Sequence, residues 1–185
     1  MNEGLIASRY AGALLQYAIE HHADTDLYHM MKQVADCYLN VPDLGRTFGN
    51  WTLDTEKRKA LFLDLFPGYN PQSLDVLSNF LDLLIRQRRE NAMHSVSLQY
   101  ADKYRDRHGI IYGVFTTTLP PDDGLLEKIR NLLNPGNPEK VELEWKEDPD
   151  LIGGFTLTLG MNEWDASLRT RLREVGKSYG LKEFY

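Results

Sequence analysis

The spacing of hydrophobic residues in the first 106 positions is that of one amphipathic helix after another. Residues 4 to 22 place apolar side chains three and four positions apart, as a helix with one buried face requires. Breaks that contain Asp, Pro or Gly separate this segment from later ones, and a brief element lies around Pro42 and Gly45. We therefore predict a compact all-α bundle with short connections. Its other helices are expected at about 25 to 39, 54 to 65, 72 to 88 and 91 to 107.

The pattern changes from helical to alternating near His108. Residues 110 to 119 are rich in β-branched and aromatic side chains. Residues 141 to 145 and 155 to 159 alternate apolar with polar side chains, which is typical of strands that bury one face. All three segments are predicted to be strands of one sheet.

Helices are expected at about 122 to 133 and 166 to 178, where they would cover one face of that sheet. The predicted fold is therefore mainly α. An N-terminal helical bundle occupies residues 1 to 106, and a small C-terminal α+β domain occupies residues 107 to 185.

Two adjacent glycines, Gly153 and Gly154, precede the last predicted strand. A phosphate-binding loop would place its glycines directly before a helix and follow them with Lys and Ser or Thr, whereas here a strand follows. The pair is therefore interpreted as a bulge or as a close approach of another backbone. Asp165 is predicted to be the N-cap of the helix that follows. The apolar face of that helix consists of Leu168, Leu172 and Val175. Its arginines, which are Arg169, Arg171 and Arg173, are expected to point mostly outward.

Charge and composition limit the classes of function. A hydrophobic content of 42% suits a folded globular chain. The formal net charge of -6 is shared equally by the two predicted domains, so a broad basic face for nucleic acid is not expected. The one basic cluster, at Arg86, Arg88 and Arg89, ends a helical segment. Cations at a helix end suit the helix dipole, and this role is favoured over a specific anion site.

Residues that could support catalysis or bind a metal are few. The histidines lack the spacing of a metal site and are interpreted as solvated or capping residues; they are His21, His22, His29, His94 and His108. Cys37, the single cysteine, is expected to be a buried structural thiol in a reducing compartment. We therefore predict no catalytic residue, metal or cofactor, and an enzyme is the weakest hypothesis.

Two helical segments carry more apolar surface than one buried face requires. At 100° per residue, the apolar side chains of residues 74 to 85 cover about 200° of arc, as do those of the first helix, against about 100° for an ordinary surface helix. One interpretation is central burial in the bundle. The other is a groove between the two helices that receives an amphipathic helix from a partner.

Three stretches carry a resemblance to a known family: "SRYAGALLQYA" at 8 to 18, "NFLDLLIRQRR" at 79 to 89, and "DPDLIGGFTLTLG" followed by "DASLRTRL". In this order, over nearly the whole chain, they resemble the delta subunit of F-type ATP synthase, the family of the mitochondrial oligomycin-sensitivity-conferring protein. The resemblance implies a six-helix bundle on the catalytic head, an α+β domain on the peripheral stalk, and a non-catalytic stator role. Met161 and Thr170 depart from the family's usual acidic residue and glycine, which affects the details of the stalk contact.

The resemblance also implies partners and site residues. In the family, the first and fifth helices form a groove for the N-terminal helix of an alpha subunit. Here those helices have the excess apolar arc, so the groove is favoured over central burial. The implied partners are alpha subunits of the head and b subunits of the stalk, without nucleic acid. The residues carried over for partner binding are Tyr10, Ala13, Leu14, Phe80, Leu83 and Leu84. Those carried over as structural in the C-terminal domain are Gly153, Gly154, Asp165, Arg169 and Arg171.

The expected location is the cytoplasmic face of the bacterial inner membrane, as a peripheral part of the ATP synthase complex. Apolar runs shorter than the ~20 residues of a membrane span, and the lack of a presequence, favour this location without direct membrane insertion. A mature organellar chain would have the same features. The alternative hypothesis is a free-standing helical adaptor that binds an amphipathic helix.

Overall fold

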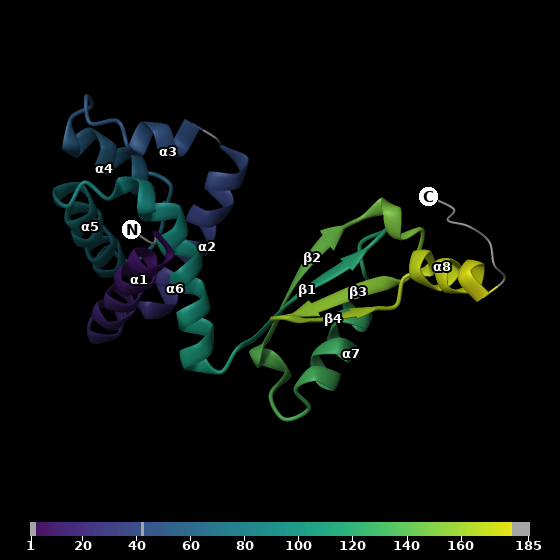
Figure 1. Ribbon diagram of the computed structural model, residues 1–185. Coiled ribbons are helices and arrows are strands. Elements are labelled where there is room, and N and C mark those ends of the chain that lie inside the picture. The colour runs from purple at the N-terminus through teal and green to yellow at the C-terminus, as the bar shows by residue number, and fades with distance from the viewer. Residues whose placement is uncertain (1–2, 42, 179–185) are drawn as a thin grey trace. The chain divides into compact units, whose positions relative to one another are not determined.

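The computed structural model describes residues 3–41 and 43–178, and the chain separates into two compact units, Met1–Arg107 and His108–Tyr185. The first unit is helical, and the second contains a four-stranded sheet (Figure 1). The first unit's helices are α1 (Glu3–Glu20), α2 (Asp24–Asn40), α3 (Asp43–Phe48), α4 (Thr55–Leu63), α5 (Pro71–Arg86) and α6 (Met93–His108), with the short 3-10 helix η1 (Glu90–Ala92) before α6.

The start of α5 follows directly from its sequence. The Asn70 side chain accepts a hydrogen bond from the backbone N–H of Gln72 at 3.0 Å, and Pro71 occupies the first turn, where its missing N–H costs nothing. At the other end of α5, Arg88 adopts a φ of 53°. The N–H of Arg89 then reaches back to the carbonyl of Leu84 at 2.9 Å, which is a helix termination that glycine usually provides.

The core of the first unit combines small residues of α1 with large residues of the other helices. Ala7, Ala11 and Ala18 of α1 have 0% exposure. Tyr28 of α2 stacks on Tyr104 of α6 with ring centroids 4.3 Å apart. The largest fully buried side chains around them include Leu27, Met30, Met31, Phe62, Leu77, Leu81, Leu84, Met93 and Tyr100. Burial of these side chains provides the main driving force for folding of this unit.

The sheet of the second unit has the strand order β2-β1-β3-β4. Its strands are β1 (Ile111–Thr117), β2 (Val141–Glu147), β3 (Phe155–Leu159) and β4 (Asn162–Asp165). Strands β1 and β2 are parallel, so the chain must cross between them, and α7 (Asp123–Leu133) with the 3-10 helix η2 (Pro138–Lys140) provides the crossover. The other two pairings are antiparallel. Strand β4 was not predicted from the sequence.

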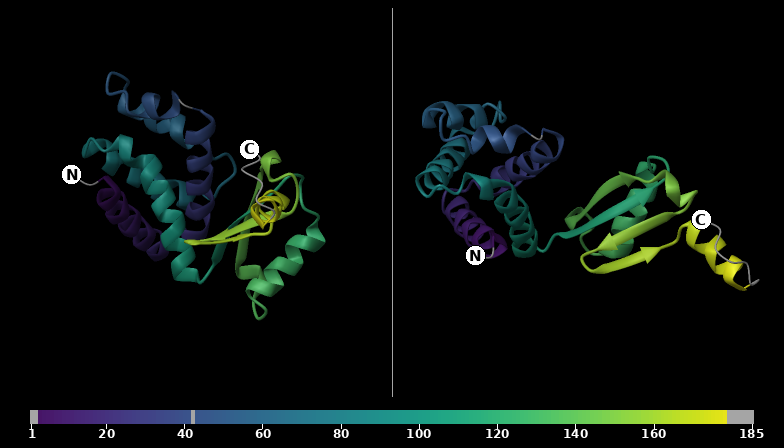
Figure 2. Two further views of the ribbon diagram at one scale, coloured as in Figure 1. Left: turned by 45° about the vertical axis from the view of Figure 1, so that its right-hand side comes forward. Right: turned by 45° about the horizontal axis from the view of Figure 1, so that its top comes forward.

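Helix α7 lies against one face of the sheet, and α8 (Leu168–Ser178) lies beyond the sheet's end (Figures 1 and 2). Phe115 on the covered face has 0% exposure. The prediction that both helices cover the sheet is therefore wrong for α8. Leu168 and Leu172 of α8 are 44% and 59% exposed, so its expected apolar face is not buried within the second unit.

We expect residues 1 to 106 to fold without the rest of the chain, because α1 to α6 bury a core of their own. Heating this fragment should give one sigmoidal loss of helical circular dichroism. A gradual loss in the fragment, beside a cooperative transition in the full chain, would contradict the expectation and show that the helices need the second unit.

Candidate functional site

Helices α1 and α5 contact each other along their length. The ring of Tyr10 meets that of Phe80 edge to face, with centroids 6.4 Å apart. About two turns along α1, the Asn79 side chain donates a hydrogen bond to the Tyr17 hydroxyl at 3.2 Å. The Gln72 side chain, at the start of α5, donates a hydrogen bond to the carbonyl of His21, just after α1, at 3.0 Å. Later positions of α1 therefore pair with earlier positions of α5, so the start of α1 lies near the end of α5.

An outward-facing strip of mostly apolar side chains follows this contact. At 100° per residue, the four α1 positions in it fall within about 60° of arc. Ala13 and Asn79 are exposed, Leu83 is 42% exposed, and the others are half-buried. The strip, called here the α1–α5 strip, consists of Ile6, Tyr10, Ala13 and Tyr17 from α1 with Asn79 and Leu83 from α5.

The structure brings the six predicted partner-binding residues together on these two helices but divides them by depth. Tyr10, Ala13 and Leu83 reach the α1–α5 strip. The other three lie beneath it in the core, with exposures of 2% for Leu14, 5% for Phe80 and 0% for Leu84. Sequence reasoning did not single out Ile6 or Asn79 as site residues, although the spacing of 6, 10, 13 and 17 is the signal of one helix face.

The paired glycines of the second unit allow a close approach of two backbone segments, as predicted. Gly154 has a φ of 78°, and a Cβ built on it would lie 2.3 Å from the carbonyl oxygen of Ala166. The carbonyl of Gly153 accepts a hydrogen bond from the N–H of Leu168 at 2.9 Å. The glycines therefore attach the start of α8 to the segment just before β3, and they do not form a phosphate-binding loop.

Asp165 ends β4, so its predicted role as N-cap is wrong. The N-cap is Ser167, whose hydroxyl oxygen accepts a hydrogen bond from the N–H of Thr170 at 3.2 Å. The Asp165 carboxylate accepts from the Thr170 hydroxyl at 2.6 Å and from the Ser167 N–H at 2.8 Å. These hydrogen bonds, that from the Thr170 side chain first, lower the pKa of Asp165 to about 2.

The two predicted structural arginines of α8 differ in burial. Arg171 is exposed, as expected. Arg169 is half-buried, and its Nε has no hydrogen-bond partner among the described residues.

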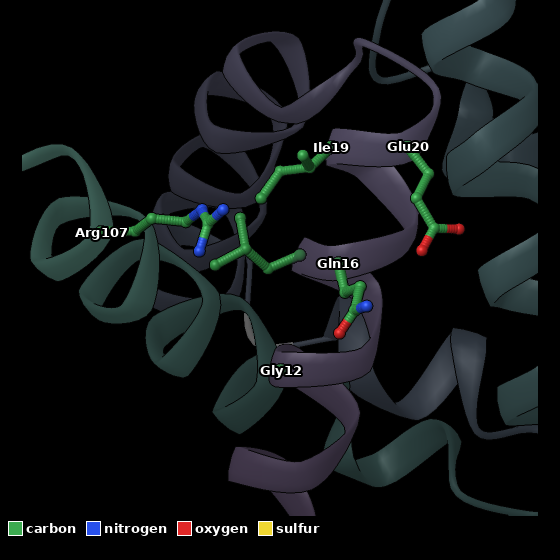
Figure 3. A pocket seen from close by; sticks show the side chains of 6 residues that line it. Gly12, Gln16, Ile19, Glu20 and Arg107 are labelled. Carbon is green, nitrogen blue, oxygen red and sulfur yellow. The ribbon is translucent and has the colours of Figure 1, made fainter.

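A pocket of about 310 Å³ lies between α1 and the C-terminal end of α6 (Figure 3). Arg107 points towards α1, whereas Glu20 points away from Arg107. The lining residues are Gly12, Leu15, Gln16, Ile19, Glu20 and Arg107. None of these six provides a nucleophile next to a general base. The pocket therefore lacks the pair of residues that covalent or acid–base catalysis requires.

The pKa values of two tyrosines in the first unit are raised. Burial raises the pKa of Tyr38 to about 12, and burial followed by the nearby Asp24 raises the pKa of Tyr100. Cys37 is half-buried, so the expectation of a buried thiol is not met. Over residues 3–41 and 43–178, no three His, Cys, Asp or Glu side chains gather as metal ligands. In the same part of the chain, no helix combines the length and apolar character of a membrane span.

The sequence profile of the family described as "ATP synthase delta (OSCP) subunit" matches residues 6–178. The chain belongs to this family. It is therefore a non-catalytic subunit of the rotary ATP synthase, as the sequence predicted.

Curated relatives cover almost the entire chain. The ATP synthase subunit delta of Phocaeicola vulgatus is 30% identical over 176 residues, which cover 95% of this chain and 94% of the relative. That of Prochlorococcus marinus subsp. pastoris is 31% identical over 176 residues, covering 94% and 95%. A chain in the cryo-EM structure of the Toxoplasma gondii mitochondrial ATP synthase hexamer has the same fold, with a TM-score of 0.58, 14% identity and coverage of 96% and 98%.

Replacing Gly154 with Ala should destabilise the second unit by roughly 2 to 5 kcal/mol, because positive φ and backbone overlap act together. Gly160→Ala is the matched control, since Gly160 has a φ of 58° but open space around it, and should cost only about 1 to 2 kcal/mol. Denaturant unfolding followed by Trp145 and Trp164 fluorescence, with the exposed Trp51 changed to Phe, measures both. Equal losses would show that Ala166 does not restrict position 154.

Asp165 should titrate near pH 2 in the folded chain, against an ordinary value of 3.8. Because folding lowers its pKa, its contribution to stability is present above about pH 4 and is lost as the pH falls towards 2. Side-chain carboxyl NMR gives the midpoint directly. Thr170→Val, which removes the donor hydroxyl, should raise the midpoint towards 3.8. An unchanged midpoint in that variant would contradict the assignment to Thr170.

Proposed function

We propose that this chain is the stator subunit that links the top of the catalytic head to the peripheral stalk. The first unit binds the N-terminal helix of an alpha subunit, and the second unit contacts the b subunits. By holding the head against rotation, the link supports the coupling of proton flow to ATP synthesis. Family membership and the α1–α5 strip support this function, and the strip is the observation that carries it.

The α1–α5 strip has the size and chemistry to bind a helix. From Ile6 to Tyr17 it extends about 16 Å at 1.5 Å per residue, which matches about three turns of a partner helix. Exposed Ala13 allows close approach of that partner, while Tyr10 and Leu83 provide apolar contact on either side. Leu14, Phe80 and Leu84 hold the strip in place from below. Apolar contact of this kind is insensitive to salt, which suits a link under continuous torque.

The second unit offers a different apolar surface for the stalk. Leu168 and Leu172 of α8 are 44% and 59% exposed, and Trp164 of β4 is 51% exposed. A chain that joins two partners needs separate surfaces for them, and these residues lie on a different unit from the α1–α5 strip. The bacterial relatives support a location on the cytoplasmic face of the inner membrane, through the complex.

Replacing Ala13 with Asp should abolish tight binding of a peptide with the sequence of the alpha subunit's N-terminal helix. The new carboxylate would be buried unpaired under the partner helix, at a cost of about 2 to 4 kcal/mol, or roughly 30- to 1,000-fold in Kd. Because Ala13 is exposed in the free chain, helical circular dichroism and thermal stability should change little. Isothermal titration calorimetry measures the affinity.

Gln16→Asp is the matched control for this substitution. Gln16 is also exposed on α1 but lines the pocket beside α6, so its replacement should leave peptide affinity unchanged. Equal affinity of the Ala13→Asp and unmodified chains would remove the assignment of the α1–α5 strip. Loss of folded structure in the Ala13→Asp chain would place Ala13 in the core instead.

A further inference from the structure

A basic pocket lies at one end of the α1–α5 strip. Its volume is about 140 Å³, and it receives Arg88 and Arg89, which follow the end of α5. Ile6, the first residue of the strip, is part of its wall, so the apolar strip leads directly into the pocket. The complete lining is Ile6, Arg88, Arg89, Asn91, Ala92 and Ser95. Arg86, in the last turn of α5, adds a third guanidinium nearby in the sequence.

The positive charge at this end of the strip is not neutralised within the described part of the chain. There, the side chains of Arg86, Arg88 and Arg89 make no hydrogen bond or ion pair. The neighbouring carboxylates are already engaged by other cations. Asp82 pairs with Lys59 at 2.8 Å, and Glu90 pairs with Arg58 at 2.9 Å. Three free guanidinium groups therefore remain on a chain whose formal net charge is -6.

Arg88 occupies a position where the backbone favours glycine. Its φ of 53° lies in the left-handed region, and the bonds that end α5 are those usually accompanied by glycine at this point. Backbone strain of this kind is concentrated at binding and catalytic sites. The Arg88 side chain is therefore a candidate binding group, and its place in the pocket wall supports this independently.

The opposite end of the strip has no arginine or lysine: residues 17–20 of α1 and 71–79 of α5 contain neither, and Asp75, one turn before Asn79, is an exposed carboxylate. There Asn79 donates to the Tyr17 hydroxyl, and the Gln72 side chain donates to the carbonyl of His21 at 3.0 Å. An apolar strip holds a helix but permits it to slide or to bind in reverse. Paired charges at only one end fix direction and register, because guanidinium and carboxylate groups match in geometry as well as charge.

We propose that the occupant of the α1–α5 strip is an acidic amphipathic helix that places side-chain carboxylates of one end in the pocket of Arg88 and Arg89. This inference rests on the proposed function, whose strip it extends. The apolar face of the helix provides most of the affinity. The carboxylates select the orientation and make binding partly sensitive to salt.

The test uses the full chain, a peptide with the sequence of the alpha subunit's N-terminal helix, and the same peptide with Gln and Asn in place of Glu and Asp. Arg88→Gly removes the charge and relieves the backbone, so the variant should be at least as heat-stable as the unmodified chain. We expect it to bind the natural peptide about 10-fold more weakly at low salt. The amide peptide should bind the unmodified chain about 10-fold more weakly than the natural peptide does. Arg88→Gly should not weaken binding of the amide peptide any further.

Two control substitutions separate the loss of charge at position 88 from the change in its backbone and from the loss of an arginine elsewhere. His22→Gly relieves the same φ of 53° without removing an arginine, and Arg46→Ala removes an exposed arginine of α3. Neither should alter the affinity. Arg89→Gln removes the other arginine of the pocket and should also weaken binding of the natural peptide.

The outcomes distinguish this inference from the function on which it rests. Binding that depends on Ala13 but not on Arg88 or Arg89 would overturn the acidic helix and leave the strip intact. Equal weakening of the natural and amide peptides by Arg88→Gly would also overturn it, because the arginine would then act without a carboxylate. No binding of either peptide to the unmodified chain would overturn the proposed function itself.

Discussion

Close packing of α1 through small side chains determines the surface of the first unit. Ala7, Ala11 and Ala18 are fully buried, and such short side chains let a helix lie near its neighbours without leaving voids. The larger Tyr10 and Tyr17 then fall at the edge of the contact, where their rings and hydroxyls reach α5. The α1–α5 strip is therefore a consequence of how the core is filled. A change in the core beneath it would alter the strip without touching an exposed residue.

Much of the first unit could be predicted because helical spacing is a local property of the sequence. The choice of α1 and α5 as the candidate site also came from the sequence. Their apolar arcs exceed one face, which left central burial and a groove as alternatives, and the family resemblance favoured the groove. The depth at which each residue is buried could not be predicted from the sequence. Leu83 and Leu84 are equally apolar neighbours, yet one is 42% exposed and the other 0%, because burial depends on which helices pack beside α5. Periodicity on one helix contains no information about those neighbours.

The second unit was less predictable where tertiary pairing replaces local preference. Strand β4 has only four residues, all exposed, and its hydrogen bonds to β3 hold it as a strand. Because β4 extends to Asp165, the helix begins later than predicted, and Ser167 takes the capping position. The apolar face of α8 was expected to be buried, but the sheet ends before it. An amphipathic pattern indicates that a face will be covered, and it does not say whether the same chain covers it.

The attachment of α8 to the sheet has a mechanical consequence. Its first turn is tied to the segment before β3 by the Leu168–Gly153 hydrogen bond and to the end of β4 by the Asp165 carboxylate. Ala166 adds a third bond, from its N–H to the carbonyl of Phe155 at 2.9 Å. A pull on the helix is thus divided among bonds to two adjacent strands. The helix is therefore joined to the sheet by more than its single covalent connection, and a load on it is shared by the ends of two strands.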